Sequence, residues 1–236
     1  MEITQKILVI DDEPMITDVV KSYLEHSNFS VRIEHNGIQG LKAFYEYKPD
    51  LVVLDLMLPD LKGEEICKEI RRNARTPIIM LTAKVEEENI LNGLDIGADD
   101  YMTKPFSGKQ LVGRIKAVLR RMQSDPVPLF NRMSFNNNAL EIDLTSSEIK
   151  KFGKLVKLTP SEYHILLSLM KYPNKTFSRE ELIFIALGED FDGYDRIIDT
   201  HIKTLRQKVE DDIKNPRYII TVFGIGYKFG GGKSDT

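Results

Sequence analysis

The segment Leu51-Val52-Val53-Leu54-Asp55 is an unbroken apolar run that ends on an aspartate. Three further segments also end on a residue suited to phosphoryl chemistry: ILVIDD at 7–12, IIMLT at 78–82 and ADDYMTK at 98–104. None of them alternates between apolar and polar residues, as a strand with one face in water would. All four are therefore predicted to be strands of a buried parallel sheet.

Predicted helices alternate with these strands through the first half of the chain. They lie near residues 14–26, 38–47, 63–73, 86–96 and 107–121. This alternation predicts a doubly wound α/β fold with a five-stranded parallel sheet over residues 1–121. Such sheets bind ligands at the carboxyl ends of their strands. Side chains suited to phosphoryl chemistry are expected together at that edge: Asp11, Asp12, Asp55, Thr82 and Lys104.

The composition is that of an ordinary globular chain. Its 236 residues are 42% hydrophobic and 29% charged, which is enough for two modest domains. The single Cys67 cannot form an internal disulfide, and the N-terminus shows no apolar stretch of signal or membrane-span length, so we expect a cytoplasmic protein without a membrane partner. Residues 128–236 hold 16 basic and 15 acidic side chains. Nucleic-acid binding by this half would therefore need a local basic face.

The pattern changes after residue 121. A stretch at 122–130, which includes Gln-Ser-Asp-Pro-Val-Pro, predicts a short linker. Residues 131–232 are predicted to form an α+β domain with the following elements: an antiparallel sheet around 133–157, two helices that begin at the capping boxes Thr159-Pro160-Ser161-Glu162 and Ser178-x-x-Glu181, a third helix near 195–211 and a hairpin near 217–229. Three helices and a hairpin predict a winged helix-turn-helix, whose third helix would lie in the DNA major groove.

The predicted third helix is amphipathic. Its apolar stripe consists of Ile198, Ile202, Leu205 and Val209. The opposite face is polar and is predicted to be free to touch DNA; it consists of Arg196, Thr200, Lys203, Thr204 and Gln207. His201 and Arg206 flank the stripe, where they are expected to reach DNA phosphates.

The order and spacing of several motifs resemble those of bacterial two-component response regulators of the OmpR/PhoB type, over nearly the whole chain. In the first half the motifs are Asp11-Asp12-Glu13, Leu54-Asp55-x-Met57-Leu58-Pro59, Leu81-Thr82-Ala83, Gly97-Ala98-Asp99-Asp100-Tyr101 and Lys104-Pro105-Phe106. In the second half they are Leu158-Thr159-Pro160-Ser161-Glu162, Arg196-x-x-Asp199-x-His201-Ile202-x-x-Leu205-Arg206 and Gly224-x-Gly226-Tyr227. The resemblance implies a flavodoxin-like receiver domain that controls a DNA-binding effector by phosphorylation.

The resemblance also implies a phosphorylation site centred on Asp55. Asp55 would take a phosphoryl group from the phosphohistidine of a sensor histidine kinase. Asp11 and Asp12 would hold Mg²⁺ together with Asp55 and the backbone carbonyl of Met57. Lys104 would pair with a phosphoryl oxygen. Such a protein is not an enzyme, apart from self-catalysed phosphorylation and dephosphorylation.

In the family, phosphorylation is relayed to a dimerisation face. The Thr82 hydroxyl would move towards the phosphoryl group and Tyr101 would rotate inward, which reshapes the face made by residues 86–121. The family forms homodimers through that face. The matching residues here are an apolar patch (Leu91, Leu94 and Val112) and two ion pairs across the subunits (Asp100 with Arg114, and Asp95 with Lys116). The Lys104–Pro105 peptide bond is cis in the family.

Several departures from the family pattern concern the output. The chain has no tryptophan, and Leu187 stands where relatives often carry one, before a loop that commonly meets RNA polymerase. Thr204 replaces a frequent basic residue of the recognition helix. Phe223 replaces the wing arginine that enters the minor groove. Tyr227 is another expected DNA contact. Phe223 is expected to pack beneath the hairpin, and an apolar wedge against DNA is the alternative. DNA contact is therefore expected to be weaker or differently specified.

Other interpretations stay open. One is a small-molecule phosphatase or kinase-like enzyme with an aspartyl nucleophile, although such phosphatases usually carry a second Asp where this chain has Met57, and there is no Gly-rich P-loop. Another is a regulator whose winged helix binds a protein. Taken singly, Asp12 suits a helix cap, Lys104 a solvated charge and Tyr101 a core position.

Overall fold

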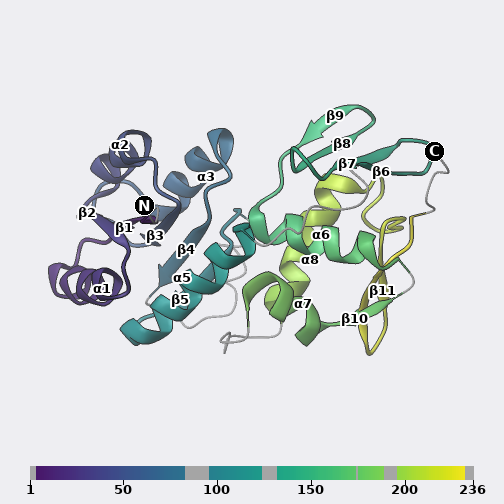
Figure 1. Ribbon diagram of the computed structural model, residues 1–236. Coiled ribbons are helices and arrows are strands. Elements are labelled where there is room, and N and C mark those ends of the chain that lie inside the picture. The colour runs from purple at the N-terminus through teal and green to yellow at the C-terminus, as the bar shows by residue number, and fades with distance from the viewer. Residues whose placement is uncertain (1–3, 83–95, 124–131, 174, 189–195, 232–236) are drawn as a thin grey trace. The chain divides into compact units, whose positions relative to one another are not determined.

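The computed structural model describes residues 4–82, 96–123, 132–173, 175–188 and 196–231 (Figure 1). The chain forms two compact units, of which the first reaches Arg120 and the second begins at Arg121. Among the described helices, none is both long enough and apolar enough to cross a membrane.

The first unit is a parallel sheet with helices on both faces, which confirms the predicted fold. Its described elements are β1 (Lys6–Ile10), α1 (Pro14–His26), β2 (Ser30–Glu34), α2 (Gly37–Tyr47), β3 (Leu51–Asp55), α3 (Gly63–Asn73), β4 (Ile78–Thr82), β5 (Asp100–Thr103) and α5 (Gly108–Gln123). The strands lie in the order β2-β1-β3-β4-β5, and every neighbouring pair is parallel. The helix predicted near 86–96 falls largely outside the described residues.

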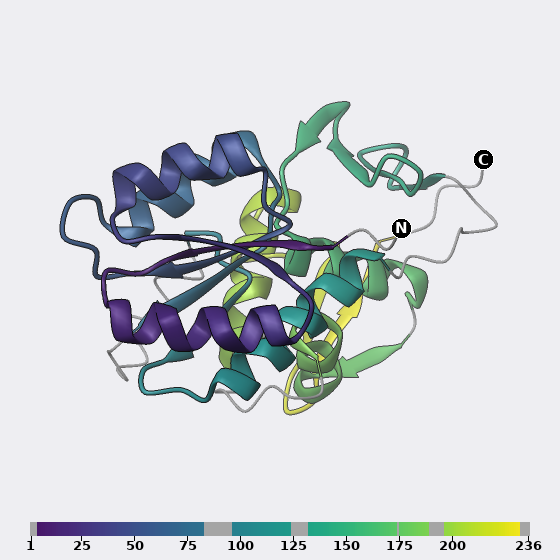
Figure 2. The same cartoon turned by 60° about the vertical axis from the view of Figure 1, so that its left-hand side comes forward.

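The apolar runs are buried because helices cover both faces of the sheet. One core cluster joins side chains of β1, β3 and β4, such as Val9, Val53 and Leu81, to Leu24 of α1 and Ile115 of α5. Figure 2 shows α1 and α2 on opposite sides of the sheet. A strand covered on both faces buries successive side chains, which is why β3 and β4 are buried along their whole length.

The second unit has the predicted winged helix-turn-helix organisation. Its described elements are β6 (Arg132–Phe135), β7 (Leu140–Asp143), β8 (Glu148–Lys151), β9 (Lys154–Val156), α6 (Pro160–Lys171), β10 (Thr176–Ser178), α7 (Arg179–Leu187), α8 (Arg196–Val209), β11 (Ile219–Val222) and β12 (Gly226–Phe229). The strands β6 to β9 form an antiparallel sheet in sequence order, and β10, β12 and β11 form a second one.

Both predicted capping boxes are confirmed. Glu162 N donates to Thr159 Oγ1 at 3.3 Å, and Thr159 N donates to Glu162 Oε2 at 2.8 Å. Glu181 N donates to Ser178 Oγ at 3.1 Å, and Ser178 N donates to Glu181 Oε2 at 2.9 Å. These bonds satisfy amide groups that a helix N-terminus leaves unpaired, so they explain where α6 and α7 begin.

Candidate functional site

Three carboxylates converge where β1 and β3 end. Asp11 and Asp12 follow β1, Asp55 is the last residue of β3, and one oxygen of each lies within 4.8 Å of the others. Asp11 and Asp55 are buried, whereas Asp12 is exposed. Oxygen ligands of this kind suit a hard divalent cation such as Mg²⁺. The predicted grouping of acidic residues is therefore present at the expected edge of the sheet.

Lys104, which follows β5, enters the same cluster. Its Nζ lies 2.7 Å from Asp11 Oδ2, 2.5 Å from Asp55 Oδ2 and 2.8 Å from Glu13 Oε1. The Lys104–Pro105 peptide bond is cis, as the family resemblance implied. The sequence does not predict a role for Glu13, because its partner Lys104 lies 91 residues further along the chain.

Burial and ion pairing oppose each other in this cluster. Burial raises the pKa of the Asp11 carboxyl, although Lys104 and the N–H of Glu13 lower it in part. Burial alone would lower the pKa of Lys104, but hydrogen bonds to Asp11, Asp55 and Glu13 outweigh it and raise that pKa. The ammonium group thus stays charged and compensates the carboxylates.

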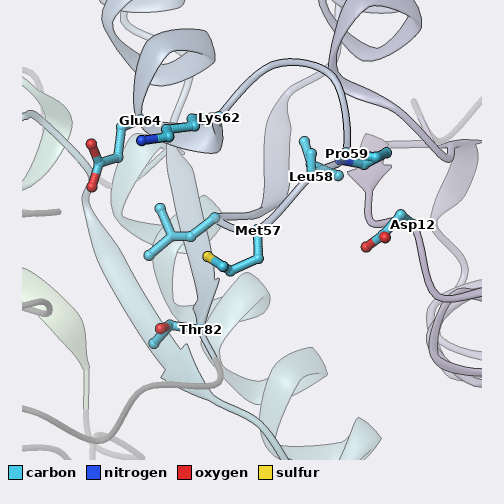
Figure 3. A pocket seen from close by; sticks show the side chains of 8 residues that line it. Asp12, Met57, Leu58, Pro59, Lys62, Glu64 and Thr82 are labelled. Carbon is cyan, nitrogen blue, oxygen red and sulfur yellow. The ribbon is translucent and has the colours of Figure 1, made fainter.

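A pocket of about 410 Å³ opens beside the carboxylates (Figure 3). Its lining residues are Asp12, Leu56, Met57, Leu58, Pro59, Lys62, Glu64 and Thr82. Thr82, at the end of β4, is 3% exposed. Met57 is 65% exposed, and its side chain projects into solvent. Tyr101 is a buried residue of β5 and is not among the lining residues.

The loop between β3 and α3 forms much of this pocket, and hydrogen bonds fix both its ends. Met57 N donates to Asp55 Oδ1 at 2.9 Å, and Gly63 N donates to Leu56 O at 3.2 Å. A Cβ on Gly63 would lie 2.2 Å from Asp55 O, so only glycine permits this approach. At the far side, Asp60 accepts hydrogen bonds from Gly37 N (2.7 Å) and from Ile38 N (2.9 Å).

Asp99 of the first unit forms an ion pair with Arg71. Asp99 is fully buried, and its Oδ2 lies 2.6 Å from Arg71 Nη2 and accepts a hydrogen bond from Ile78 N at 2.9 Å. Arg71 also donates to the carbonyls of Gly97 (2.7 Å) and Thr76 (2.6 Å). The pair joins the end of α3 to the starts of β4 and β5. No sequence pattern predicts this ion pair, because its members lie 28 residues apart.

The predicted dimer face is only partly described, since Leu91, Leu94 and Asp95 lie outside the described residues. Asp100 and Arg114 pair with each other within one chain, with Nη1 3.0 Å from both carboxylate oxygens. Val112 belongs to the core cluster, where it shares the sheet-facing side of α5 with Leu111 and Ile115, and it is 9% exposed. Its place in the dimer patch stays a prediction. Lys116 is exposed.

The predicted apolar stripe of α8 is confirmed, but its free face is narrower than predicted. The stripe residues Ile198, Ile202, Leu205 and Val209 are all buried. Of the predicted DNA-contacting side chains on α8, Lys203 and Gln207 are exposed, whereas Thr200, His201 and Thr204 are 7%, 1% and 3% exposed. The Thr204 hydroxyl donates to the backbone of its own helix, at Thr200 O and His201 O. The Arg196 side chain is outside the described part of the chain.

Arg206 and Tyr227 serve the structure of the wing, and their contacts with DNA stay predictions. Arg206 donates to Ile219 O, at 2.6 Å from Nη2, and to Thr221 Oγ1 at 2.7 Å. Tyr227 is 5% exposed and its hydroxyl donates to Asp199 Oδ1 at 2.7 Å. Burial and this carboxylate raise the pKa of Tyr227 to about 12. Both side chains hold the hairpin to α8.

Phe223 does not pack beneath the hairpin, so that prediction is wrong. It is 92% exposed, and its neighbour Ile225 is 55% exposed. Ile225 N donates to Val222 O at 3.0 Å, and Gly224 has φ of +76°. This tight turn places Phe223 at the tip of the hairpin, with its side chain in solvent. The tip of the wing is therefore an apolar protrusion.

Comparison with known proteins gives matches over both units. Residues 7–116 match the response regulator receiver domain, and residues 153–229 match the C-terminal domain of transcriptional regulatory proteins. The DNA-binding response regulator MtrA of Mycolicibacterium smegmatis is 38% identical over 226 residues, which are 96% of this chain and 97% of that protein. MtrA of Mycobacterium tuberculosis H37Rv is 37% identical, with 96% and 97% covered.

Two solved structures extend the comparison. The response regulator DrrB, described as a Thermotoga maritima OmpR/PhoB homologue, is 36% identical and has a TM-score of 0.53, with 97% of this chain and 100% of that chain covered. A mutant of RitR has a TM-score of 0.78 at 24% identity over the same shares, which is a likeness of fold alone.

Proposed function

Since the chain belongs to the response regulators of the OmpR/PhoB type, which are phosphorylation-activated transcriptional regulators, we propose that Asp55 is its phosphoacceptor. One observation carries this assignment: the buried Asp55 carboxylate meets both a lysine ammonium, at 2.5 Å, and two further carboxylates. Asp55 Oδ1 accepts the N–H of Met57 and Oδ2 lies 2.5 Å from Lys104 Nζ, so Oδ2 becomes the proposed nucleophile once Lys104 exchanges it for a phosphoryl oxygen. It forms the O–P bond while the P–N bond of a kinase phosphohistidine breaks.

The other residues of the site orient and compensate this transfer. Asp11, Asp12, Asp55 and the Met57 carbonyl would hold Mg²⁺, which supplies positive charge to the phosphoryl oxygens. Lys104 would exchange its carboxylate partners for a phosphoryl oxygen. We propose that Thr82 and Tyr101 then act as the switch pair, because Thr82 lines the pocket and Tyr101 lies on the neighbouring strand β5.

The partners follow from the family. We propose a sensor histidine kinase as the phosphodonor, promoter DNA as the target, and a homodimer as the active form. A contact with RNA polymerase near Leu187 is part of the proposal, as is a cytoplasmic location, which suits the buried free thiol of Cys67. No activity on another substrate is proposed, because Met57 stands where an aspartyl phosphatase would need its second carboxylate.

Genome-wide mapping of bound sites tests the function as a whole. The protein would be compared with its Asp55→Asn variant, both expressed at the same level. Occupied promoters that are lost in the variant would support phosphorylation-controlled DNA binding. An identical set of sites in both proteins would contradict control through Asp55, and an absence of sites in the unaltered protein would favour a winged helix that binds a protein.

The wing tip is proposed to act on DNA as an apolar wedge. Phe223 supplies no charge for the minor groove, but an exposed aromatic ring can press against sugars or a base step. We expect Phe223→Arg to weaken binding to the native operator by roughly tenfold, because a lost wedge contact of about 1–2 kcal/mol corresponds to that factor. Salt-dependent titrations and thermal melts of the effector would measure it.

The same titrations separate the alternatives for Phe223. A tighter complex whose log-log salt slope steepens by roughly one unit would mean that arginine merely restores a phosphate contact, which contradicts the wedge. Unchanged affinity and slope would mean that the wing tip does not touch DNA. Ile213→Arg, which adds the same charge at an exposed residue before β11, is the control for a general gain of charge.

Dimerisation is proposed to use the face formed by residues 86–121. Leu94→Asp would place a charge in an apolar contact, where an unpaired and desolvated charge costs several kcal/mol, on the order of 3–5. Beryllofluoride-treated protein is then expected to stay monomeric in sedimentation velocity. Val19→Asp, which makes the same change at a half-exposed residue of α1, should still dimerise. A dimer that survives Leu94→Asp would place the interface elsewhere.

A further inference from the structure

The loop between β3 and α3 carries Met57, whose carbonyl is a proposed metal ligand, and three separate contacts fix its path. At its start, Met57 N is bonded to the Asp55 carboxylate. At its end, Gly63 N is bonded to Leu56 O. The third contact, at Asp60, is different in kind because it reaches outside the loop.

Asp60 fastens the loop to the N-terminus of α2. Its two carboxylate oxygens accept from the first two amides of that helix, at 2.7 Å for Gly37 and 2.9 Å for Ile38. A helix N-terminus favours a negative charge, so this geometry is stabilising. Gly37 also lies against the loop backbone, because a Cβ there would come within 2.8 Å of Leu61 O. The loop and the N-terminus of α2 thus pack closely against each other.

Helix α2 has a second N-terminal cap besides Asp60. The N-cap residue Asn36 already accepts the N–H of Gln39 at 2.9 Å through its own side chain. Asp60 lies 23 residues further along the chain, so its contact with Gly37 orders the loop as much as the helix. Without it, the segment from Met57 to Lys62 would keep the hydrogen bonds at its two ends and the buried side chain of Leu58.

We propose that Asp60 is a positioning residue, which fixes the β3–α3 loop against α2 and thereby sets the affinity of the acidic site for a divalent cation. The proposal rests on the proposed role of Asp11, Asp12, Asp55 and Met57 in holding Mg²⁺. Residues that orient metal ligands without touching the metal typically change affinity by about 10–100-fold when they are replaced.

The test is a titration of the full-length protein with Mg²⁺ alone, followed by calorimetry or by the amide signals of the loop. Asp60→Ala is expected to bind Mg²⁺ about tenfold more weakly. The Mg²⁺ affinity of Asp60→Asn is expected to lie between those of the unaltered protein and Asp60→Ala, since its amide oxygen still accepts one N–H. Asn36→Ala is the matched control: it removes a cap from the same helix end at a cost of about 1 kcal/mol, without touching the loop.

Phosphorylation by acetyl phosphate gives a second readout. Asp60→Ala should reach the rate of the unaltered protein, but only at about tenfold higher Mg²⁺, whereas a damaged nucleophile would lower the rate at saturating Mg²⁺. Equal Mg²⁺ affinity in Asp60→Ala and the unaltered protein would overturn the inference. An equal loss in Asn36→Ala would also overturn it, because the loss would then come from α2 stability. If the unaltered protein binds no Mg²⁺, the proposed function itself fails.

Discussion

Replacement of Asp55 by Asn is expected to abolish phosphoryl incorporation from acetyl phosphate. The amide cannot act as the nucleophile, and the acidic cluster loses one of the three carboxylates that lie within 4.8 Å of one another. Asp12→Ala is expected to lose incorporation for a different reason, because it removes a proposed Mg²⁺ ligand. Intact-protein mass spectrometry after exposure to the donor and Mg²⁺ measures both effects.

Two controls show whether the loss of phosphorylation is specific to the site. Asp18→Asn changes an exposed aspartate of α1 and should be phosphorylated like the unaltered protein. Raised Mg²⁺ should restore part of the incorporation in Asp12→Ala and none in Asp55→Asn, because only the second variant lacks the acceptor. Phosphorylation that persists in Asp55→Asn would move the acceptor to another residue.

The acidic site was predictable because strand position alone determines it. Asp11, Asp55 and Thr82 each end or follow a buried apolar run, and parallel strands bring their carboxyl ends together whatever the loops do. Glu13 and Asp60 were missed because their partners, Lys104 and the N-terminus of α2, are distant in the chain. No apolar run predicts strand β2 either, since this edge strand carries Arg32 and Glu34.

In the second unit, less of the candidate DNA-binding surface could be predicted from the sequence. The helical period of α8 identified its buried stripe, but periodicity says nothing about whether a polar side chain beside that stripe is bonded internally. Arg206 and Tyr227 look like groups for DNA on the sequence, yet they bond to the backbone of β11 and to Asp199. Phe223 shows the same limit for an apolar residue, since turn geometry and not hydrophobicity decides its exposure.

Arg71→Met is expected to destabilise the first unit by about 3–5 kcal/mol, because it leaves Asp99 as a buried charge without its partner. The methionine keeps most of the side-chain volume, so the loss reports the guanidinium group. Its hydrogen bonds to Gly97 O and Thr76 O are lost as well. Since Gly97 leads into β5, which in turn leads to Lys104, local loosening of this segment would also slow phosphorylation.

A double-mutant cycle isolates the ion pair from these carbonyl bonds. Asp99→Asn is expected to cost less than Arg71→Met, because Arg71 is partly exposed and retains two carbonyl acceptors, while the new amide still accepts the N–H of Ile78. The double variant should be more stable than Arg71→Met alone, since no buried charge remains. Chemical denaturation measures each, with Arg72→Met as the control: its pair with Glu69 is largely exposed and is worth about 0–1 kcal/mol. If Arg71→Met and Arg72→Met lose stability equally, Asp99 does not depend on Arg71 for charge compensation.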